Sequence, residues 1–335
     1  MSEAIAVVVV THDSALEIDD LLTALASALE PGDEVVFVDN ASSDTTVARL
    51  RAGGARVLEQ HRNAGFGSGC RAGARATSAP LLLFLNPDTH LDAQALARLR
   101  AVAAERPSWG AWQPAVMLPD GRINTSGGVV HFLGFGWAGQ CGELAGGLRE
   151  DPHEIAFASG AALVIRRAAW DALGGFEDSY FLYGEDLDLG LRLWLAGYAV
   201  GIDPRARVTH RYDFDKGPRK WYLLERNRWL TLIADYPGAL LIAIAPALMA
   251  AELGLLVIAA RDGWLRAKLR ADVSVLVALP RALRRRRAVQ STRTIGARAF
   301  VKRLSDALEN PNLGELPALL GAGQRAYFAL VRLVV

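Results

Sequence analysis

Cysteine is scarce in this chain, and the scarcity excludes the classes of protein that depend on it. The two cysteines among 335 residues, Cys70 and Cys141, cannot build a disulfide framework and do not have the spacing of a metal-binding cluster. This is typical of a protein in a reducing compartment. The N-terminus also lacks the basic and apolar regions of a signal peptide, so we expect the first part of the chain to stay in the cytoplasm.

A large net charge is also lacking, but the charges are unevenly distributed. Residues 1–236 hold 22 Lys and Arg against 30 Asp and Glu, a net charge of −8, whereas residues 237–335 hold 15 against 6, a net charge of +9. With 51% hydrophobic and 22% charged residues, the chain is globular. We therefore predict a domain over residues 1–236 and a basic, apolar region over residues 237–335 that meets phosphates or an anionic membrane surface.

Two nucleotide-binding signatures are missing from the first predicted strand. The glycines at residues 65–69 and at Gly73 resemble a dinucleotide fingerprint only superficially, since they do not follow that strand, and this argues against an oxidoreductase. The basic glycine-rich loop that a nucleotidyltransferase needs is absent from residues 11–14. The basic residues alternate with aliphatic ones and have few aromatic neighbours, so we expect no nucleic acid partner.

Alternating strand and helix patterns in the first domain predict an α/β fold. The expected strands are residues 5–10, 34–38, 56–58, 81–85, 158–166 and 199–208, and the expected helices are residues 16–29, 45–52, 93–105 and a segment that ends at Ala76. This order predicts a mainly parallel sheet with helices on both faces, which binds ligands at the carboxyl ends of its strands.

Polar clusters fall at three of these strand ends: residues 11–13, 39–44 and 86–88. Asp39 could accept hydrogen bonds from a base or a ribose. Asp88 could hold a divalent cation against a diphosphate, because Mg²⁺ takes few protein ligands. The alternative is that Asn86 and Asp88 only cap a turn.

An acidic cluster, Glu185, Asp186 and Asp188, directly follows an aromatic and apolar run and is interspersed with leucines. Carboxylates held against apolar surface gain proton affinity, which a general base needs. A solvated helix end is the alternative, and we favour the catalytic interpretation.

Basic residues beyond the last predicted strand complete the candidate site. His210 stands at the polar end of that strand, although a lone histidine is more often a surface residue. Arg226 and Arg228 lie on a predicted helix and could stabilise a diphosphate leaving group, or they could be ordinary surface charges.

Residues 120–150 are rich in glycine and include three aromatic residues. They predict either a mobile lid or a β-hairpin with ordinary turn glycines, and both interpretations stay open.

The C-terminal region combines an aliphatic run with a basic amphipathic helix. Residues 239–260 are long enough to span a bilayer, although Pro246 and Glu252 interrupt them. From Leu265, apolar residues recur every three or four positions, with arginines on the other faces. We expect association with a membrane, either peripheral or anchored by residues 239–260. The alternative is a soluble helical hairpin that packs on the first domain or on a dimer partner, so a homo-oligomer stays open.

Taken in order, these motifs carry a resemblance to a known family. The segments are VTHD (10–13), VDNASSD (38–44), NAGFG (63–67), LNPD (85–88), ASGA (158–161), GGFE (174–177), YGEDLDL (183–189) and His210. The set resembles family 2 glycosyltransferases of the GT-A fold, and within them the bacterial rhamnosyltransferase-like group. The resemblance covers residues 5 to about 235, and more weakly the C-terminal extension.

The resemblance implies roles for the site residues. Asp39 would contact the nucleotide base with Thr11 nearby, Asp88 and His210 would hold Mg²⁺ or Mn²⁺, and Asp186 would be the general base with Glu185 orienting the acceptor. The expected donor-binding residues are Thr11, Asp13, Asp39, Asn63, Gly65, Asn86, Arg226 and Arg228. Two motifs depart from the family pattern: THD replaces Thr-Tyr-Asn, and NPD (86–88) replaces the paired Asp-x-Asp, which leaves one carboxylate for the metal.

The implied reaction is an inverting transfer of a sugar from a nucleotide-diphosphate donor, with thymidine diphosphate rhamnose (dTDP-rhamnose) favoured by the resemblance. The C-terminal region expected to face the membrane suggests a polyprenyl-linked glycan or a cell-surface polysaccharide as the acceptor, at the cytoplasmic face of the cell membrane. A nucleotidyltransferase that makes sugar nucleotides and a non-catalytic membrane scaffold are the alternatives.

Overall fold

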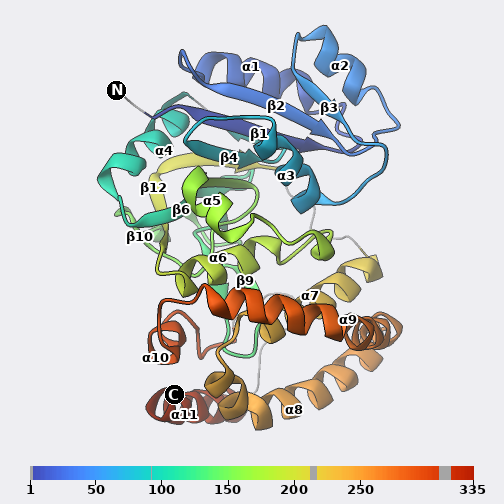
Figure 1. Cartoon of the computed structure of the whole chain (residues 1–335), viewed down its shortest axis with the longest axis vertical. Helices are drawn as coiled ribbons and strands as arrows, with labels where there is room; N and C mark the ends of the chain where they lie inside the picture. Colours follow the sequence, from blue (N-terminus) through green and yellow to red (C-terminus); the bar gives the residue numbers. More distant parts are fainter. Residues whose placement is uncertain (1–2, 92, 212–216, 309–317) are drawn as a thin grey trace. The chain divides into compact units, whose positions relative to one another are not determined.

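The computed structural model describes residues 3–91, 93–211, 217–308 and 318–335 (Figure 1). The chain forms two compact units, and each unit is made of three separate segments of the sequence. Unit 1 comprises Met1–Gly128, Ala138–Leu193 and Tyr198–Tyr212, and unit 2 comprises Val129–Trp137, Trp194–Gly197 and Asp213–Val335. The division predicted between residues 236 and 237 stays a prediction.

Unit 1 is built on a sheet of ten strands among its described residues. In spatial order the main path is β10 (His153–Glu154), β12 (Ala199–His210), β6 (Trp109–Met117), β11 (Ala162–Arg166), β4 (Leu81–Leu85), β1 (Ile5–Thr11), β2 (Glu34–Asp39) and β3 (Val57–Glu59). In addition, β5 (Thr89–Leu91) pairs with β12 and β7 (Ile123–Thr125) pairs with β6. A separate two-stranded sheet joins β8 (Gly128–Val130) to β9 (Gly136–Ala138).

Helices connect these strands and make up most of unit 2 (Figure 1). The first unit contains α1 (Ile18–Ala28), α2 (Thr46–Ala52), α3 (Phe66–Arg75), α4 (Ala93–Glu105), α5 (Arg167–Leu173) and most of α6 (Glu185–Leu195), with 3-10 turns at Ala145–Gly147 and Asp178–Tyr180. The second contains α7 (Gly217–Asp235), α8 (Gly238–Arg261), α9 (Leu265–Ser291), α10 (Ala297–Val301) and α11 (Ala318–Val334).

The predicted α/β fold is confirmed, and β1 to β4 form the expected parallel ladder. Strand β1 pairs in parallel with β2 and β4, and β2 pairs in parallel with β3. All seven residues of β1 are buried, as a continuous β-branched run requires when both faces of a sheet are covered. The rest of the sheet is mixed, because β11 runs antiparallel to both β4 and β6.

Two expectations about strands were wrong. The strand expected over residues 158–166 is shorter, since β11 begins at Ala162 and residues 158–161 form a loop. The strand β6 was not predicted, because its sequence WGAWQPAVM has neither an alternating pattern nor a pure aliphatic run. In residues 120–150, the paired strands β8 and β9 agree with the hairpin interpretation.

Glycines in α3 serve close packing of the helix on the sheet. A Cβ atom at Gly73 would stand 2.3 Å from a methyl carbon of Val8, and one at Gly69 would stand 2.7 Å from a methyl carbon of Val10. Neither position leaves room for a side chain, so glycine lets α3 approach β1 directly. This packing explains the glycine cluster that resembles a dinucleotide fingerprint.

The polar strand ends lie at one edge of the parallel ladder. Thr11, the last residue of β1, is the register partner of Asp39, the last residue of β2. Leu85 ends β4 beside Val9, so the turn that begins at Asn86 leaves from the same edge. The sheet therefore brings the three predicted clusters to one side, as expected for parallel strands.

Unit 2 buries charged residues and exposes aliphatic ones. Helices α7 and α9 pack along each other, and Lys268 of α9 is fully buried. Helix α8 is long and apolar enough to cross a membrane by length and composition, with a mean hydropathy of 2.3 over its most apolar window and only 17% of that window buried. Large aliphatic side chains are more than 45% exposed on α8, α9 and α11, among them Ile242, Met249, Leu253, Val257, Leu269, Val273, Leu276, Val277, Leu330 and Leu333.

Candidate functional site

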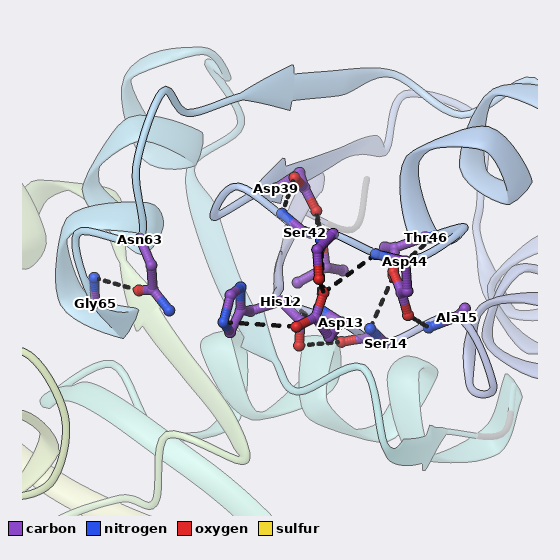
Figure 2. Close-up of polar contacts among 12 residues, drawn as sticks. His12, Asp13, Ser14, Ala15, Asp39, Ser42, Asp44, Thr46, Asn63 and Gly65 are labelled. Atoms are coloured by element: carbon purple, nitrogen blue, oxygen red, sulfur yellow. Dashed lines mark hydrogen bonds and ion pairs between the residues drawn. The ribbon is translucent and has the colours of Figure 1, made fainter.

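Asp39 is held between the ends of β1 and β2 (Figure 2). Its Oδ1 accepts a hydrogen bond from the hydroxyl of Thr11 at 3.0 Å and another from the hydroxyl of Ser42, and its Oδ2 accepts one from the Ser42 backbone N–H at 2.9 Å. Asp39 is 2% exposed and Thr11 is fully buried. A carboxylate has about four acceptor positions, so one remains on Oδ2 for a ligand N–H or O–H.

Asp13 ties the loop after β1 to the loop after β2. Its backbone has a φ of +50°, in the left-handed region that aspartate tolerates better than most residues. Its Oδ1 accepts hydrogen bonds from the backbone N–H groups of Ser43 at 2.7 Å and Asp44 at 3.3 Å (Figure 2). The bond from Ser43 lowers the pKa of this exposed carboxyl. The side chain thus positions the loops beside Asp39.

Gly65 allows the backbones of two loops to come into direct contact. Its φ is +91°, and a Cβ atom there would stand 2.2 Å from the carbonyl oxygen of Phe181. Its N–H donates to Oδ1 of Asn63 at 3.0 Å, and its carbonyl accepts from Nδ2 of Asn40 at 3.1 Å. The contact joins the loop before α3 to the loop before α6, where Phe181 and Tyr183 also have positive φ.

Asn86, Asp88 and His210 are brought together by the ends of β4 and β12. Nε2 of His210 is 3.1 Å from Oδ1 of Asp88 and 3.3 Å from Nδ2 of Asn86. His210 is 3% exposed, whereas about a third of the Asp88 side chain is accessible. On its other side the ring meets Asn124, whose Oδ1 is 3.3 Å from Nδ1.

The Asp88–His210 pair fits one edge of a divalent cation site. In octahedral coordination with bonds near 2.1 Å, neighbouring ligand atoms are about 3 Å apart, and Asp88 Oδ1 and His210 Nε2 are separated by 3.1 Å. Within the described residues, no group of three or more His, Cys, Asp or Glu side chains could hold a metal. The described part of the chain thus offers two ligands, and a cation there would need others from water or from a bound phosphate, which is how Mg²⁺ is commonly held.

Asp186 lies at the start of α6 with its carboxylate oriented by backbone groups. Its Oδ2 accepts from the N–H of Gly160 at 3.1 Å, and its Oδ1 accepts from the N–H of Leu187 at 2.8 Å. The residue is half-buried, and burial raises the pKa of the carboxyl. This is the environment of a carboxylate with increased basicity.

Glu185 is buried with one carboxyl oxygen that lacks a hydrogen-bond partner among the described residues. This oxygen is Oε2, and the residue is 5% exposed. Burial, and then the neighbouring charge of Asp186, raise the pKa of Glu185 to about 8. Glu185 therefore holds a proton at neutral pH, which lowers the cost of its burial.

Asp188, the third acid of the cluster, is structural. It is fully buried and bonded to the guanidinium of Arg192, with Nε at 2.8 Å and Nη2 at 2.7 Å, and to the hydroxyl of Tyr180 at 3.2 Å. Arg192 also donates to the carbonyl oxygens of Leu173 and Gly175. These bonds fix α6 against the preceding loop, so the cluster divides into one supporting acid and two at the site.

The loop of residues 158–161 connects the two halves of the candidate site. The carbonyl of Ala161 accepts from the backbone N–H of Asn86 at 3.0 Å, while the N–H of Gly160 donates to Asp186. One turn of chain therefore fixes the positions of both the Asn86–Asp88 turn and the Asp186 carboxylate. Sequence reasoning expected a strand here and did not assign Gly160 a contact with the acid.

Two predicted arginines belong to unit 2. Arg228 is 5% exposed and donates to Glu225, to Glu252 and to the carbonyl of Leu133. Its guanidinium is engaged within that unit, and the expected role in donor binding stays a prediction. Arg226 is half-buried, donates to Asn227 at 3.1 Å, and has a buried Nε without a hydrogen-bond partner among the described residues.

The residues that sequence reasoning missed are Asn124, Ser42 and Gly160. Ser42 lies inside the polar cluster 39–44, so its contact with Asp39 could have been found from the tendency of Asp to bond backbone and hydroxyl groups two or three residues on. Asn124 has no such local signal, because its partner is 86 positions away.

A family model described as "Glycosyl transferase family 2" matches residues 6–173 of this chain. The N-acetylglucosaminyl-diphospho-decaprenol L-rhamnosyltransferase of Mycobacterium tuberculosis is 31% identical over 242 residues, which cover 65% of this chain and 79% of that protein.

Solved structures resemble the fold. The structure of GalNAc-T7 with UDP, GalNAc and Mn²⁺ superposes with a TM-score of 0.57 at 16% identity, and covers 69% of this chain and 48% of that one. The structure of S. aureus TarS 1-349 in complex with UDP superposes with a TM-score of 0.53 at 17% identity, and covers 98% of this chain and 90% of that one. At such low identity the likeness concerns the fold alone.

Proposed function

Because this chain belongs to glycosyl transferase family 2 and is a rhamnosyltransferase-like glycosyltransferase, we propose that it transfers a sugar from a nucleoside diphosphate to a lipid-linked glycan with inversion. The observation that carries the proposal is the loop of residues 158–161, which binds both the Asn86–Asp88 turn and Asp186. Sugar transfer needs one group that binds the donor diphosphate and another that takes the proton of the acceptor hydroxyl. The two groups must be held at fixed positions relative to each other.

Asp186 is the proposed general base. The acceptor hydroxyl oxygen forms a bond to the anomeric carbon, the bond from that carbon to the diphosphate oxygen breaks, and the electron pair leaves with the nucleoside diphosphate. The hydroxyl proton passes to the Asp186 carboxylate, whose pKa is raised by burial and is therefore closer to the working pH. A single displacement inverts the anomeric centre, so no covalent nucleophile is needed. Glu185, protonated beside it, orients the acceptor by donating a hydrogen bond.

Asp88 and His210 are the proposed protein ligands of Mg²⁺ or Mn²⁺, as their 3.1 Å separation supports. When bound, such an ion offsets the negative charge that develops on the leaving diphosphate. Asn86 is proposed to donate its amide N–H groups toward the donor, and the roles expected for Arg226 and Arg228 toward the diphosphate stay predictions.

The nucleoside is proposed to bind at the ends of β1 and β2. Asp39 has an acceptor position left for a base or ribose donor, and Thr11 and Asp13 hold that carboxylate and its loops in place. Asn63 and Gly65 shape the neighbouring loop, where the absence of a Cβ atom permits close approach. The relative named above as an L-rhamnosyltransferase favours dTDP-rhamnose as the donor.

The acceptor is proposed to be a polyprenyl-linked glycan or growing polysaccharide at the cytoplasmic face of the membrane. The relative's name describes a diphospho-decaprenol acceptor, and unit 2 exposes aliphatic faces on α8, α9 and α11. Glu252, near the middle of α8, is paired with Arg228 and Lys268. A helix across the bilayer would expose these charges to lipid, so we propose that α8 lies in the plane of an anionic membrane surface.

The test is a calorimetric titration of the full chain with a panel of nucleoside diphosphates and their sugars, with and without Mn²⁺. We expect metal-dependent binding of one nucleotide, lost in Asp88→Ala. For the base, Asp186→Asn should lower kcat by about 10²–10⁴-fold while the donor still binds.

Two outcomes would overturn parts of this proposal. Binding of no nucleotide sugar would favour a non-catalytic membrane scaffold, and near wild-type turnover of Asp186→Asn would remove the assigned base. Formation of a sugar nucleotide from a nucleoside triphosphate and a sugar phosphate would instead favour a nucleotidyltransferase.

A further inference from the structure

Asn124 lies against the side of the His210 imidazole opposite to Asp88. It comes from β7, is 7% exposed, and its Oδ1 is 3.3 Å from Nδ1 of His210. We propose that Asn124 is a positioning residue that keeps the proton of His210 on Nδ1 and thereby presents a bare Nε2 toward Asp88. The inference rests on the proposed function, since it assigns Asn124 to the cation site of that reaction.

The two amides on either side of the ring require the same tautomer. The carbonyl oxygen of Asn124 can only accept, so Nδ1 must carry the hydrogen, whereas Nδ2 of Asn86 can only donate, so Nε2 must be bare. A neutral imidazole has one N–H, and this assignment satisfies both contacts with it.

The same assignment leaves two electron-rich atoms facing each other. A bare Nε2 and a carboxylate oxygen of Asp88 are 3.1 Å apart, and neither can donate to the other. Such a pair is stabilised by a positive charge shared between them, which a divalent cation supplies. A histidine that binds a metal through one nitrogen commonly donates its other N–H to a carbonyl or carboxylate, and removing that partner typically weakens metal binding 10–100-fold.

The sheet explains how Asn124 reaches this place. Met117 at the end of β6 is the register partner of Ile123 in β7 and of Thr209 in β12. Asn124 directly follows Ile123, and His210 directly follows Thr209. The end of β6 therefore places the two residues side by side although they are 86 positions apart in the sequence. The register shift between Val116 and Met117 occurs at this point, as irregularities next to functional residues often do.

The experiment compares Asn124→Leu, which removes the acceptor, with Asn124→Asp, which keeps it. In the full chain, calorimetry with MnCl₂ alone should show a Kd that rises 10–100-fold in Asn124→Leu and stays within a few-fold of wild type in Asn124→Asp. In parallel, ¹⁵N NMR of the metal-free protein should show the His210 ring with hydrogen on Nδ1 in wild type and Asn124→Asp, and a shift toward hydrogen on Nε2 in Asn124→Leu.

Ser126→Ala is the matched control, because it removes a hydrogen bond to Gly139 two residues along the same segment without a contact to His210. It should leave both readouts unchanged. Hydrogen on Nε2 in metal-free wild type overturns the inference even if Asn124→Leu does not fold, as does a Kd within twofold of wild type in a folded Asn124→Leu. If wild type binds no Mn²⁺, the metal part of the proposed function fails, and the NMR tautomer alone decides the role of Asn124.

Discussion

One buried ionisable side chain in each unit, Glu185 in unit 1 and Lys268 in unit 2, has opposite surroundings. In unit 1, Glu185 is almost fully buried with one oxygen that has no hydrogen-bond partner among the described residues. In unit 2, the ammonium of Lys268 is equally inaccessible but contacts Glu225, Glu252 and Asp272. An unpaired buried group is costly and is retained where chemistry needs it, whereas a fully paired cluster fixes a packing arrangement.

The two units also differ in how many large aliphatic side chains they expose to solvent. Large aliphatic residues of unit 1 are mostly interior, and Leu16 is one of few exposed ones, whereas α8 and α9 of unit 2 present a series of them. Burial thus distinguishes the candidate site in unit 1, and exposure distinguishes the proposed membrane surface in unit 2. Substitutions in the two units test each side of this contrast.

The largest effect is expected from Lys268→Met. It leaves Glu225 and Glu252 with less positive charge in a largely buried cluster, and breaking such a cluster typically costs about 3–5 kcal/mol. Denaturant titration measures the loss. Arg49→Met is the control in unit 1, where the pair with Asp19 is exposed and its loss should cost less than about 1 kcal/mol. Equal losses in the two variants would contradict the structural role of the cluster.

The next effect concerns the exposed face of α8. Replacing Ile242, Leu253 and Val257 together by serine removes three aliphatic side chains that are at least 67% exposed. Since burial of one such side chain contributes about 1.5–3 kcal/mol when complete, partial loss of three should weaken binding to anionic liposomes about 100-fold. Flotation assays measure it. Leu16→Ser, also an exposed aliphatic, should bind as wild type does, and unchanged binding of the triple variant would refute the membrane surface.

Acid is expected to destabilise unit 2 through His131. Burial lowers the pKa of this imidazole from 6.5 to about 3, so the folded state binds the proton more weakly than the unfolded state. The neutral imidazole contributes its full share of the free energy of unfolding above pH 6.5, and this share is lost as the pH falls. The expected loss is about 2 kcal/mol between pH 7 and pH 5. Hydrogen exchange should show unit 2 losing protection over this range, and less so in His131→Gln. Loss confined to unit 1 would contradict the assignment.

Alkali is expected to act on unit 1 through Glu185. In the folded state the pKa of Glu185 is raised from 4.5 to about 8. The contribution of the protonated carboxyl to the free energy of unfolding is therefore complete below pH 4.5 and is lost as the pH rises through 8. Between pH 7 and pH 9 the loss should be about 1 kcal/mol, and Glu185→Gln, which cannot ionise, should not show it. Thermal unfolding at both pH values measures this effect. A variant with the same pH dependence as wild type would show that Glu185 is not the group responsible.

The parts of the site that local sequence could predict are those that stand at strand ends or in dense clusters. The positions of Thr11, Asp39 and Asn86 at one sheet edge followed from parallel strand order, and the family resemblance is confirmed by the match over residues 6–173. The acidic run could be recognised because leucines and aromatics surround it. The pairing of Asp188 was missed, although Arg192 follows it by four residues, which is the spacing of an ion pair on one face of a helix.

The parts that escaped prediction depend on partners far along the chain. The ion pair between Arg228 and Glu252 could not be predicted, because Glu252 lies on the next helix, whereas the expected role of Arg228 toward the diphosphate stays a prediction. Asn124 is a single amide in a glycine-rich segment and acquires a role only when β7 and β12 flank the end of β6. Strand β6 itself has no periodic pattern, and its burial on all nine residues is imposed by its neighbours.

The contact between Gly65 and Phe181 has a consequence for redesign of this enzyme. Since the carbonyl of Phe181 occupies the space of a side chain at position 65, the loops on either side of that contact cannot be exchanged independently between homologous proteins. A chimera that imports a new loop around residues 60–65 to change the accepted nucleotide must keep this glycine or import the segment of Phe181 with it. Directed evolution of donor preference should therefore recover paired changes in these two stretches more often than single ones.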